Sequence, residues 1–86
     1  MPSRTSEATV HALLSRLVEA RKNAGVSQER LAELSGVDLG VISRAENLLR
    51  IPGMAAILDL AKALELDPCE LLAGAMADVR KNESRR

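Results

Sequence analysis

Residues 27–47 read SQERLAELSGVDLGVISRAEN, and this stretch decides the fold. Ser27 and Asp38 are residue types that cap helices, because their side-chain oxygens accept a hydrogen bond from a free backbone N–H group. Gly36 lies between them and tolerates the left-handed backbone conformation of a tight turn. The stretch therefore predicts two short helices joined by a short turn, the second helix ending near Asn47.

Three apolar residues lie where these two helices would face each other. Leu31 is in the first helix, Val37 is in the turn and Ile42 is in the second helix. Packing among them would fix the angle between the helices, which is the arrangement of a helix-turn-helix. In that arrangement the second helix projects far enough to enter the major groove of DNA.

Helical periodicity continues on both sides of this motif. Apolar residues recur at helical spacing from about residue 6 to Ala24, and Gly25 then ends the first helix. Pro52-Gly53 precedes a fourth helix, and Asp67-Pro68-Cys69-Glu70 has the residue types of a fifth helix start. The sequence therefore predicts an all-α fold of five helices. The apolar positions on the flanking helices are Val10, Leu13, Leu14, Leu17, Val18, Met54, Ile57, Leu58, Ala61, Leu64, Leu71, Leu72, Ala75, Met76 and Val79.

The chain of 86 residues has the length of a single domain. We divide it into an N-terminal flank (1–9), a helix-turn-helix domain (10–76) with its motif at about 27–47, and a basic polar tail (77–86). Residues 80–86 are polar, and we expect them to be frayed.

The composition argues against several classes of site. The chain has no Phe, Tyr or Trp, so it lacks the platforms on which single-stranded bases stack. One Cys and one His exclude an internal disulfide and a conventional zinc site. The sequence contains no recognisable nucleophile–base pair, paired-carboxylate motif or glycine-rich phosphate loop. We therefore expect no enzyme activity, no cofactor, no metal and no small-molecule substrate.

The sequence also lacks a candidate membrane segment. The first seven residues are polar, unlike a signal peptide. No apolar run approaches the roughly 18 residues that span a bilayer. We expect no membrane partner and a cytoplasmic location.

The net charge is zero, but the charges are unevenly distributed. Residues 1–52 carry seven basic and six acidic side chains, whereas residues 53–79 carry one basic and five acidic ones. Residues 80–86 carry four basic side chains and one acidic. The acidic block predicts a face turned away from phosphates, while the rest of the chain does not exclude DNA.

Residues 21–37 read RKNAGVSQERLAELSGV, which resembles the phage repressor and Cro type of helix-turn-helix domain. Bacterial XRE-family regulators share this type. The resemblance continues through Ile42-Ser43-Arg44-Ala45-Glu46 and covers roughly residues 13–73. It implies a lambda-repressor-like fold of five helices and a transcription regulator that binds double-stranded DNA.

The resemblance also implies roles for individual residues. Ser27 and Gln28 would meet a DNA phosphate, since a helix N-terminus offers free N–H groups and positive partial charge. Arg44 would contact a base, because arginine can bond a guanine edge through two hydrogen bonds. Arg21 and Glu46 match positions that form a structural ion pair. The other DNA-contacting positions are Leu39, Gly40, Val41 and Ser43 on the recognition helix, with Asn47 and Arg50 near the DNA backbone.

Two segments depart from the family pattern. Leu39, Gly40 and Val41 stand where relatives usually carry polar side chains. Leu39 and Val41 contact thymine methyl groups, pack on a partner protein, or lie exposed without a partner. Leu48-Leu49 stands where the family often has Gly and a polar residue. This pair either lengthens the third helix or forms an apolar contact surface.

We expect a homodimer, because one recognition helix contacts only a few base pairs and a two-fold pair matches a palindrome. Leu71, Leu72, Met76 and Val79 offer more apolar surface than contact with the first helix requires, so they are the predicted dimer interface. The leading interpretation is a dimeric repressor. The alternative is a protein-binding module on the same fold, such as an antitoxin-like subunit or a co-regulator with little DNA affinity.

Overall fold

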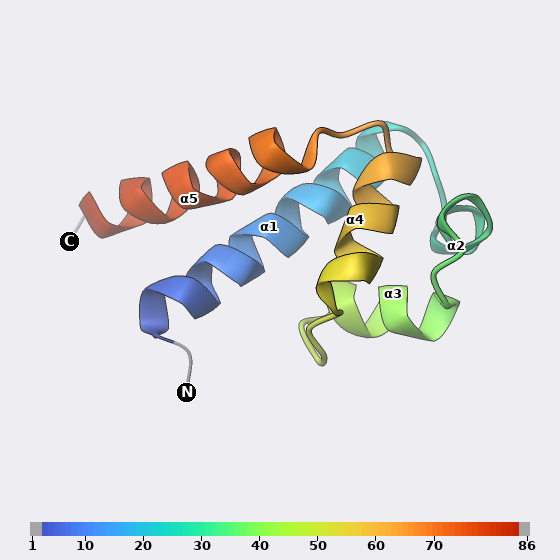
Figure 1. The fold of residues 1–86 in the computed structure, drawn as a ribbon, viewed down its shortest axis with the longest axis horizontal. Helices are drawn as coiled ribbons and strands as arrows, with labels where there is room; N and C mark the ends of the chain where they lie inside the picture. Colours follow the sequence, from blue (N-terminus) through green and yellow to red (C-terminus); the bar gives the residue numbers. More distant parts are fainter. Residues whose placement is uncertain (1–2, 85–86) are drawn as a thin grey trace.

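The computed structural model describes residues 3–84, which form five α-helices and no strand (Figure 1). The all-α prediction is therefore confirmed. The long first and last helices lie antiparallel, and their far ends are remote from the three shorter helices (Figure 1). The helices are α1 (Arg4–Asn23), α2 (Gln28–Ser35), α3 (Leu39–Glu46), α4 (Met54–Ala63) and α5 (Pro68–Ser84).

Polar side chains cap the helices where the sequence predicts. The Ser27 hydroxyl accepts a hydrogen bond from the Arg30 N–H at 3.0 Å, at the start of α2. The Asp38 carboxylate accepts one from the Gly40 N–H at 2.6 Å, at the start of α3. Each cap pairs a backbone donor that has no partner within its helix, so these residues fix where α2 and α3 begin.

Three helices end with the same hydrogen-bond pattern. After α1, α3 and α4, the residues with positive φ are Gly25 (70°), Leu48 (57°) and Glu65 (58°). Each donates its N–H to the carbonyl three residues earlier, and the next residue donates to the carbonyl five residues earlier. This is the Schellman motif, which normally favours glycine at the left-handed position. Leu48-Leu49 therefore does not lengthen α3, because Leu48 has the conformation that ends the helix.

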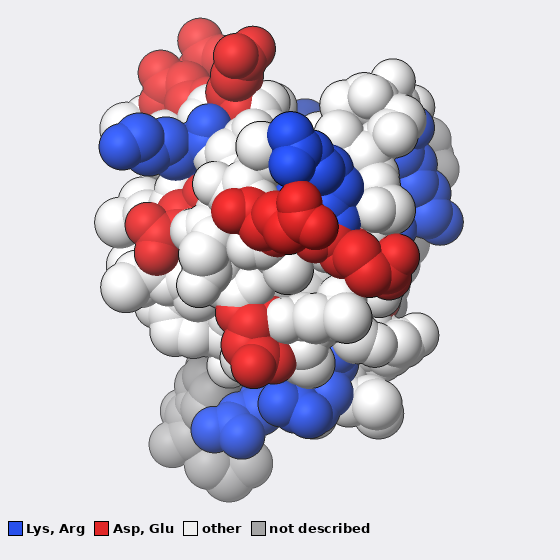
Figure 2. Space-filling model, turned by 90° about the vertical axis from the view of Figure 1, so that its right-hand side faces the viewer, with Lys and Arg blue, Asp and Glu red and all other residues white. Residues whose placement is uncertain are grey.

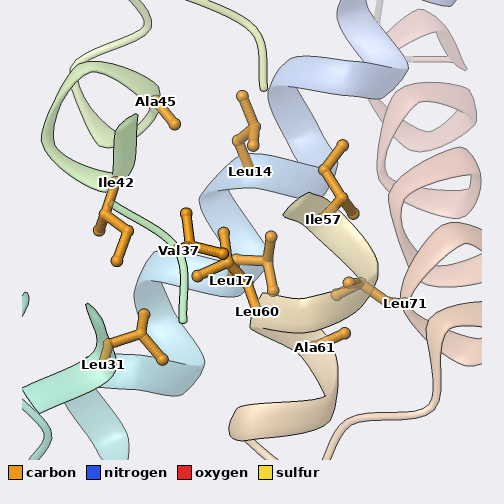
Figure 3. Close-up of a cluster of buried hydrophobic side chains, with 10 residues drawn as sticks. All are labelled: Leu14, Leu17, Leu31, Val37, Ile42, Ala45, Ile57, Leu60, Ala61 and Leu71. Carbon is orange, nitrogen blue, oxygen red and sulfur yellow. The ribbon is translucent and has the colours of Figure 1, made fainter. Parts of the chain in front are cut away.

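The hydrophobic core consists of aliphatic side chains (Figure 3). Leu31, Val37 and Ile42 are 3%, 8% and 1% exposed, which confirms the packing predicted for the helix-turn-helix. Around them lie Leu14, Leu17, Ala45, Ile57, Leu60, Ala61 and Leu71 (Figure 3). This cluster holds α3 by one side only and leaves its other side free.

The structure places residues 80–84, part of the end expected to be frayed, in helix. α5 continues to Ser84, while residues 85–86 lie outside the described part of the chain. Pairing with α1 supplies the physical reason, because Val79 is buried and the Thr5 hydroxyl donates to the Glu83 carboxylate at 3.4 Å. α1 begins at Arg4, slightly before the predicted start at about residue 6, and its first turn also contacts α5 through Thr5.

An ion pair joins the middle of α1 to α5. The Arg16 guanidinium donates from Nε and Nη2 to both oxygens of Asp78, at 2.7 and 2.9 Å. These hydrogen bonds raise the pKa of Arg16 and lower that of Asp78. Gly74 makes room for the contact, because a Cβ there would lie 2.6 Å from Arg16 Cζ. The guanidinium thus lies directly against the backbone of α5.

Candidate nucleic-acid interface

α3 has one buried side and one free side. Ile42 and Ala45 are 1% and 4% exposed and face the core. Leu39 is 40% exposed, and Arg44 is also exposed. Val41 is half-buried against the core, so it offers less surface than Leu39 to any partner.

A hydrogen-bonded network fixes the C-terminal end of α3. Arg21 of α1 donates from Nε and Nη2 to the two oxygens of Glu46, at 2.6 and 2.8 Å. Arg21 Nη1 also donates to the carbonyl of Val26 at 2.8 Å. Gln28 of α2 donates from Nε2 to Glu46 Oε1 at 2.8 Å. The carboxylate of Glu46 therefore connects α1, α2 and α3. The network includes the Arg21–Glu46 ion pair that the resemblance implies.

The charges in this network stabilise each other. The hydrogen bond to Glu46 raises the pKa of Arg21 further, although burial of the guanidinium opposes this. Burial raises the pKa of Glu46, but hydrogen bonds from Arg21 and Gln28 outweigh it and leave the pKa below its ordinary value. Both side chains are therefore charged at neutral pH.

The position of Gln28 adds something that the sequence does not predict. Its amide nitrogen is engaged with Glu46, 18 residues away, rather than free at the start of α2. No spacing rule links residues so far apart in sequence, so only the folded structure brings out this contact. Ser27 remains exposed, and its hydroxyl caps α2.

The residues beyond the first turn of α3 differ in their freedom. Asn47 is exposed, but its Nδ2 donates to the carbonyl of Ser43 at 2.9 Å, which holds the side chain against the helix end. Ser43 is half-buried. Arg50 is exposed in the segment between α3 and α4. Of the predicted DNA-contacting residues, Arg44 and Arg50 therefore present exposed positive charge on this side.

The surface charge is unevenly arranged around the end of the molecule that carries α2 and α3. Figure 2 shows basic side chains at its lower edge and also in its upper half, where they lie beside acidic ones. α3 lies along the lower edge in Figure 1. The basic side chains at the lower edge therefore lie at the level of α3, although this end of the molecule carries charges of both signs.

Two of the four predicted interface residues are not accessible. Leu71 and Val79 are each 7% exposed, because the contacts with the other helices bury them. Leu72 and Met76 are 46% and 47% exposed and lie one helical turn apart on α5. Leu72 and Met76 are thus the exposed large apolar side chains of α5.

Comparison with known proteins agrees with this geometry. A family model described as Helix-turn-helix matches residues 17–71, more than half of the chain. No curated protein and no solved structure matches this chain. Five helices around a buried turn, with a free face on α3, define a helix-turn-helix DNA-binding domain. The chain belongs to the XRE family of Cro/repressor-type helix-turn-helix proteins, which are DNA-binding transcription regulators.

Residues 3–84 contain neither a candidate membrane span nor a candidate metal site. No described helix is both long enough and apolar enough to cross a lipid bilayer. Within the same residues, no group of three or more His, Cys, Asp or Glu side chains is placed to hold a metal ion.

Proposed function

We propose that this chain is a sequence-specific repressor that binds double-stranded DNA as a homodimer, with α3 in the major groove. One observation carries the proposal. α3 is fixed by its buried side and by the Glu46 network, while Leu39 and Arg44 remain exposed on its free side. A rigid helix with an exposed arginine suits recognition of base edges.

The proposed DNA contacts involve the N-terminus of α2 and exposed side chains on and after α3. The N-terminus of α2 at Ser27 would lie beside a phosphate, where backbone N–H groups favour an anion. Arg44 would donate to a guanine edge, and Leu39 would contact a thymine methyl group. Arg50 would contribute a backbone contact beyond α3. Gln28 would act indirectly, since its side-chain amide already donates to the Glu46 carboxylate at the C-terminal end of α3.

A dimer supplies the area that one small domain lacks. We propose that the partner is a second copy and that Leu72 and Met76 of α5 lie at the interface. Exposed apolar side chains on α4, Met54 and Leu58, are candidates to extend it. Two copies would present two recognition helices to half-sites about one turn of DNA apart.

The test is selection of genomic fragments, followed by footprinting and binding measurements at several salt concentrations. A dimer with six or more phosphate contacts should lose about 1,000-fold or more in affinity between 50 and 200 mM salt. Arg44→Ala should weaken binding by about 1–3 kcal/mol. Arg80→Ala is the matched control, because Arg80 is exposed at the end of α5 remote from α3 and should matter little.

A second candidate function is a protein-binding module. The exposed apolar residues of the α3–α4 segment favour it, since Leu49 is 75% and Ile51 47% exposed. Binding of neither random nor genomic duplex DNA at low salt would support this candidate and contradict the repressor.

A further inference from the structure

We infer that Gly40 and Asp38 are positioning residues for Arg44, and that they determine which base pair Arg44 contacts. The inference rests on the proposed function, in which Arg44 meets a base. It explains why α3 carries a glycine in its first turn and a carboxylate directly before it.

The contacts around Gly40 carry this inference. A Cβ built on Gly40 would lie 3.3 Å from both Nη1 and Nη2 of Arg44. The same point is 3.0 Å from Oδ1 of Asp38. The guanidinium of Arg44 therefore extends back toward the start of α3 and faces the Asp38 carboxylate across a position that no side chain occupies.

Arg44 is otherwise uncommitted. The three ion pairs among residues 3–84 involve Arg16, Arg21 and Arg30, and none includes Arg44. A guanidinium has five N–H donors, so one edge can face Asp38 while another meets a guanine. A neighbouring carboxylate limits the orientations of the fork, and two parallel hydrogen bonds to a base demand a particular orientation.

Because glycine lowers helix stability, its presence at position 40 indicates that the space left by the missing side chain serves a purpose. Glycine within a helix is less stable than alanine by about 0.5–1 kcal/mol, and the φ of Gly40 is not positive, so the backbone does not require it. A Cβ would displace the flexible end of Arg44 and, by a few tenths of an ångström, the Asp38 cap. Gly40→Ala should therefore leave the fold intact while changing where the guanidinium lies.

The test compares base preference among matched variants. Preferred sites are selected from a random duplex library with the unaltered protein, and affinities are measured for that site and for single-base-pair changes. Arg44→Ala should lose about 5- to 150-fold in affinity and its preference at one base pair. Gly40→Ala should reduce the preference at that base pair at least about fivefold. The variant with both Gly40→Ala and Arg44→Ala should lose no more preference than Arg44→Ala alone.

Asp38→Asn is a second probe, because asparagine caps helices as well as aspartate does. It should keep the thermal stability of the protein and weaken the preference at the same base pair. An unchanged preference in Gly40→Ala would overturn the inference. The inference would also be overturned if Gly40→Ala reduced the base preference equally in the presence and in the absence of the Arg44 side chain.

A measurement without DNA separates this inference from the proposed function. NMR relaxation of the arginine Nε–H groups should find Arg44 more ordered than Arg50, and Gly40→Ala should abolish the difference. Equal mobility of Arg44 and Arg50 in the unaltered protein would contradict the positioning role. Failure to bind any duplex DNA, with Arg44 ordered by Gly40, would contradict the proposed function and the choice of base pair, but not the positioning of Arg44.

Discussion

The guanidinium of Arg21 and the carboxylate of Glu46 form two parallel hydrogen bonds between α1 and α3. Their side chains are only 11% and 14% exposed, so water screens the pair little. Gln28 completes the arrangement from α2. Three successive helices thus converge on one carboxylate, at the C-terminal end of the helix proposed to enter DNA.

Arg21→Ala should destabilise the protein by about 3 kcal/mol, because it leaves the Glu46 carboxylate buried without its charged partner. Urea unfolding followed by circular dichroism measures the change, since the chain has no aromatic residue for fluorescence. Arg30→Ala is the control, because the Arg30–Glu33 pair is exposed and should contribute less than about 1 kcal/mol. Equal effects of the two variants would contradict a structural role for the network.

Acid should weaken the contribution of Glu46. Its pKa in the folded protein lies below the ordinary value of 4.5, so its stabilising effect is present above that value. The effect is lost as the pH falls through the lower, folded-state pKa. The difference in unfolding free energy between the unaltered protein and Glu46→Gln should therefore shrink on acidification below pH 4.5. A difference that stays constant at low pH would argue against this linkage.

Leu48→Gly should stabilise the protein by up to about 1 kcal/mol, because Leu48 has a φ of 57° that costs an ordinary side chain more than glycine. Thermal unfolding measures the gain. Gly25→Ala is the reverse control, since Gly25 occupies the same position after α1 with a φ of 70° and should be destabilised by alanine. A lower melting temperature for Leu48→Gly would instead indicate that the Leu48 side chain contributes more than the strain costs.

Leu72→Glu combined with Met76→Glu should convert the proposed dimer to a monomer, because it places charges at the interface without disturbing the core. Light scattering gives the mass, and circular dichroism checks that helix content is retained. Lys81→Glu is the control for an added acidic residue on an exposed part of α5. A double variant that remains dimeric would exclude this stripe as the interface.

The sequence predicts those features that depend on local chemistry. Ser27 and Asp38 cap helices through N–H groups two or three residues away, so their residue types suffice. Likewise, the positions of Leu31, Val37 and Ile42 predict the buried turn, because apolar side chains at helical spacing must face the core.

Features that depend on distant contacts could not be predicted in this way. The partner of Gln28 lies 18 residues away, and the extension of α5 to Ser84 depends on pairing with α1. α5 carries apolar residues on more than one side, so spacing did not separate buried Val79 from exposed Met76. Nor does the residue type of Leu48 favour a left-handed conformation, which follows instead from the path of the chain after α3.

The antiparallel pair of long helices has a consequence for how the molecule opens. The first two turns of α1 and the last residues of α5 contain no buried side chain, and Val79 is the outermost buried contact of α5. Amide hydrogens there should exchange with solvent well before those of α3, whose back is sealed by the core. Local unfolding would then begin at the end remote from α3, so the proposed recognition helix would stay intact while the opposite end opens and closes.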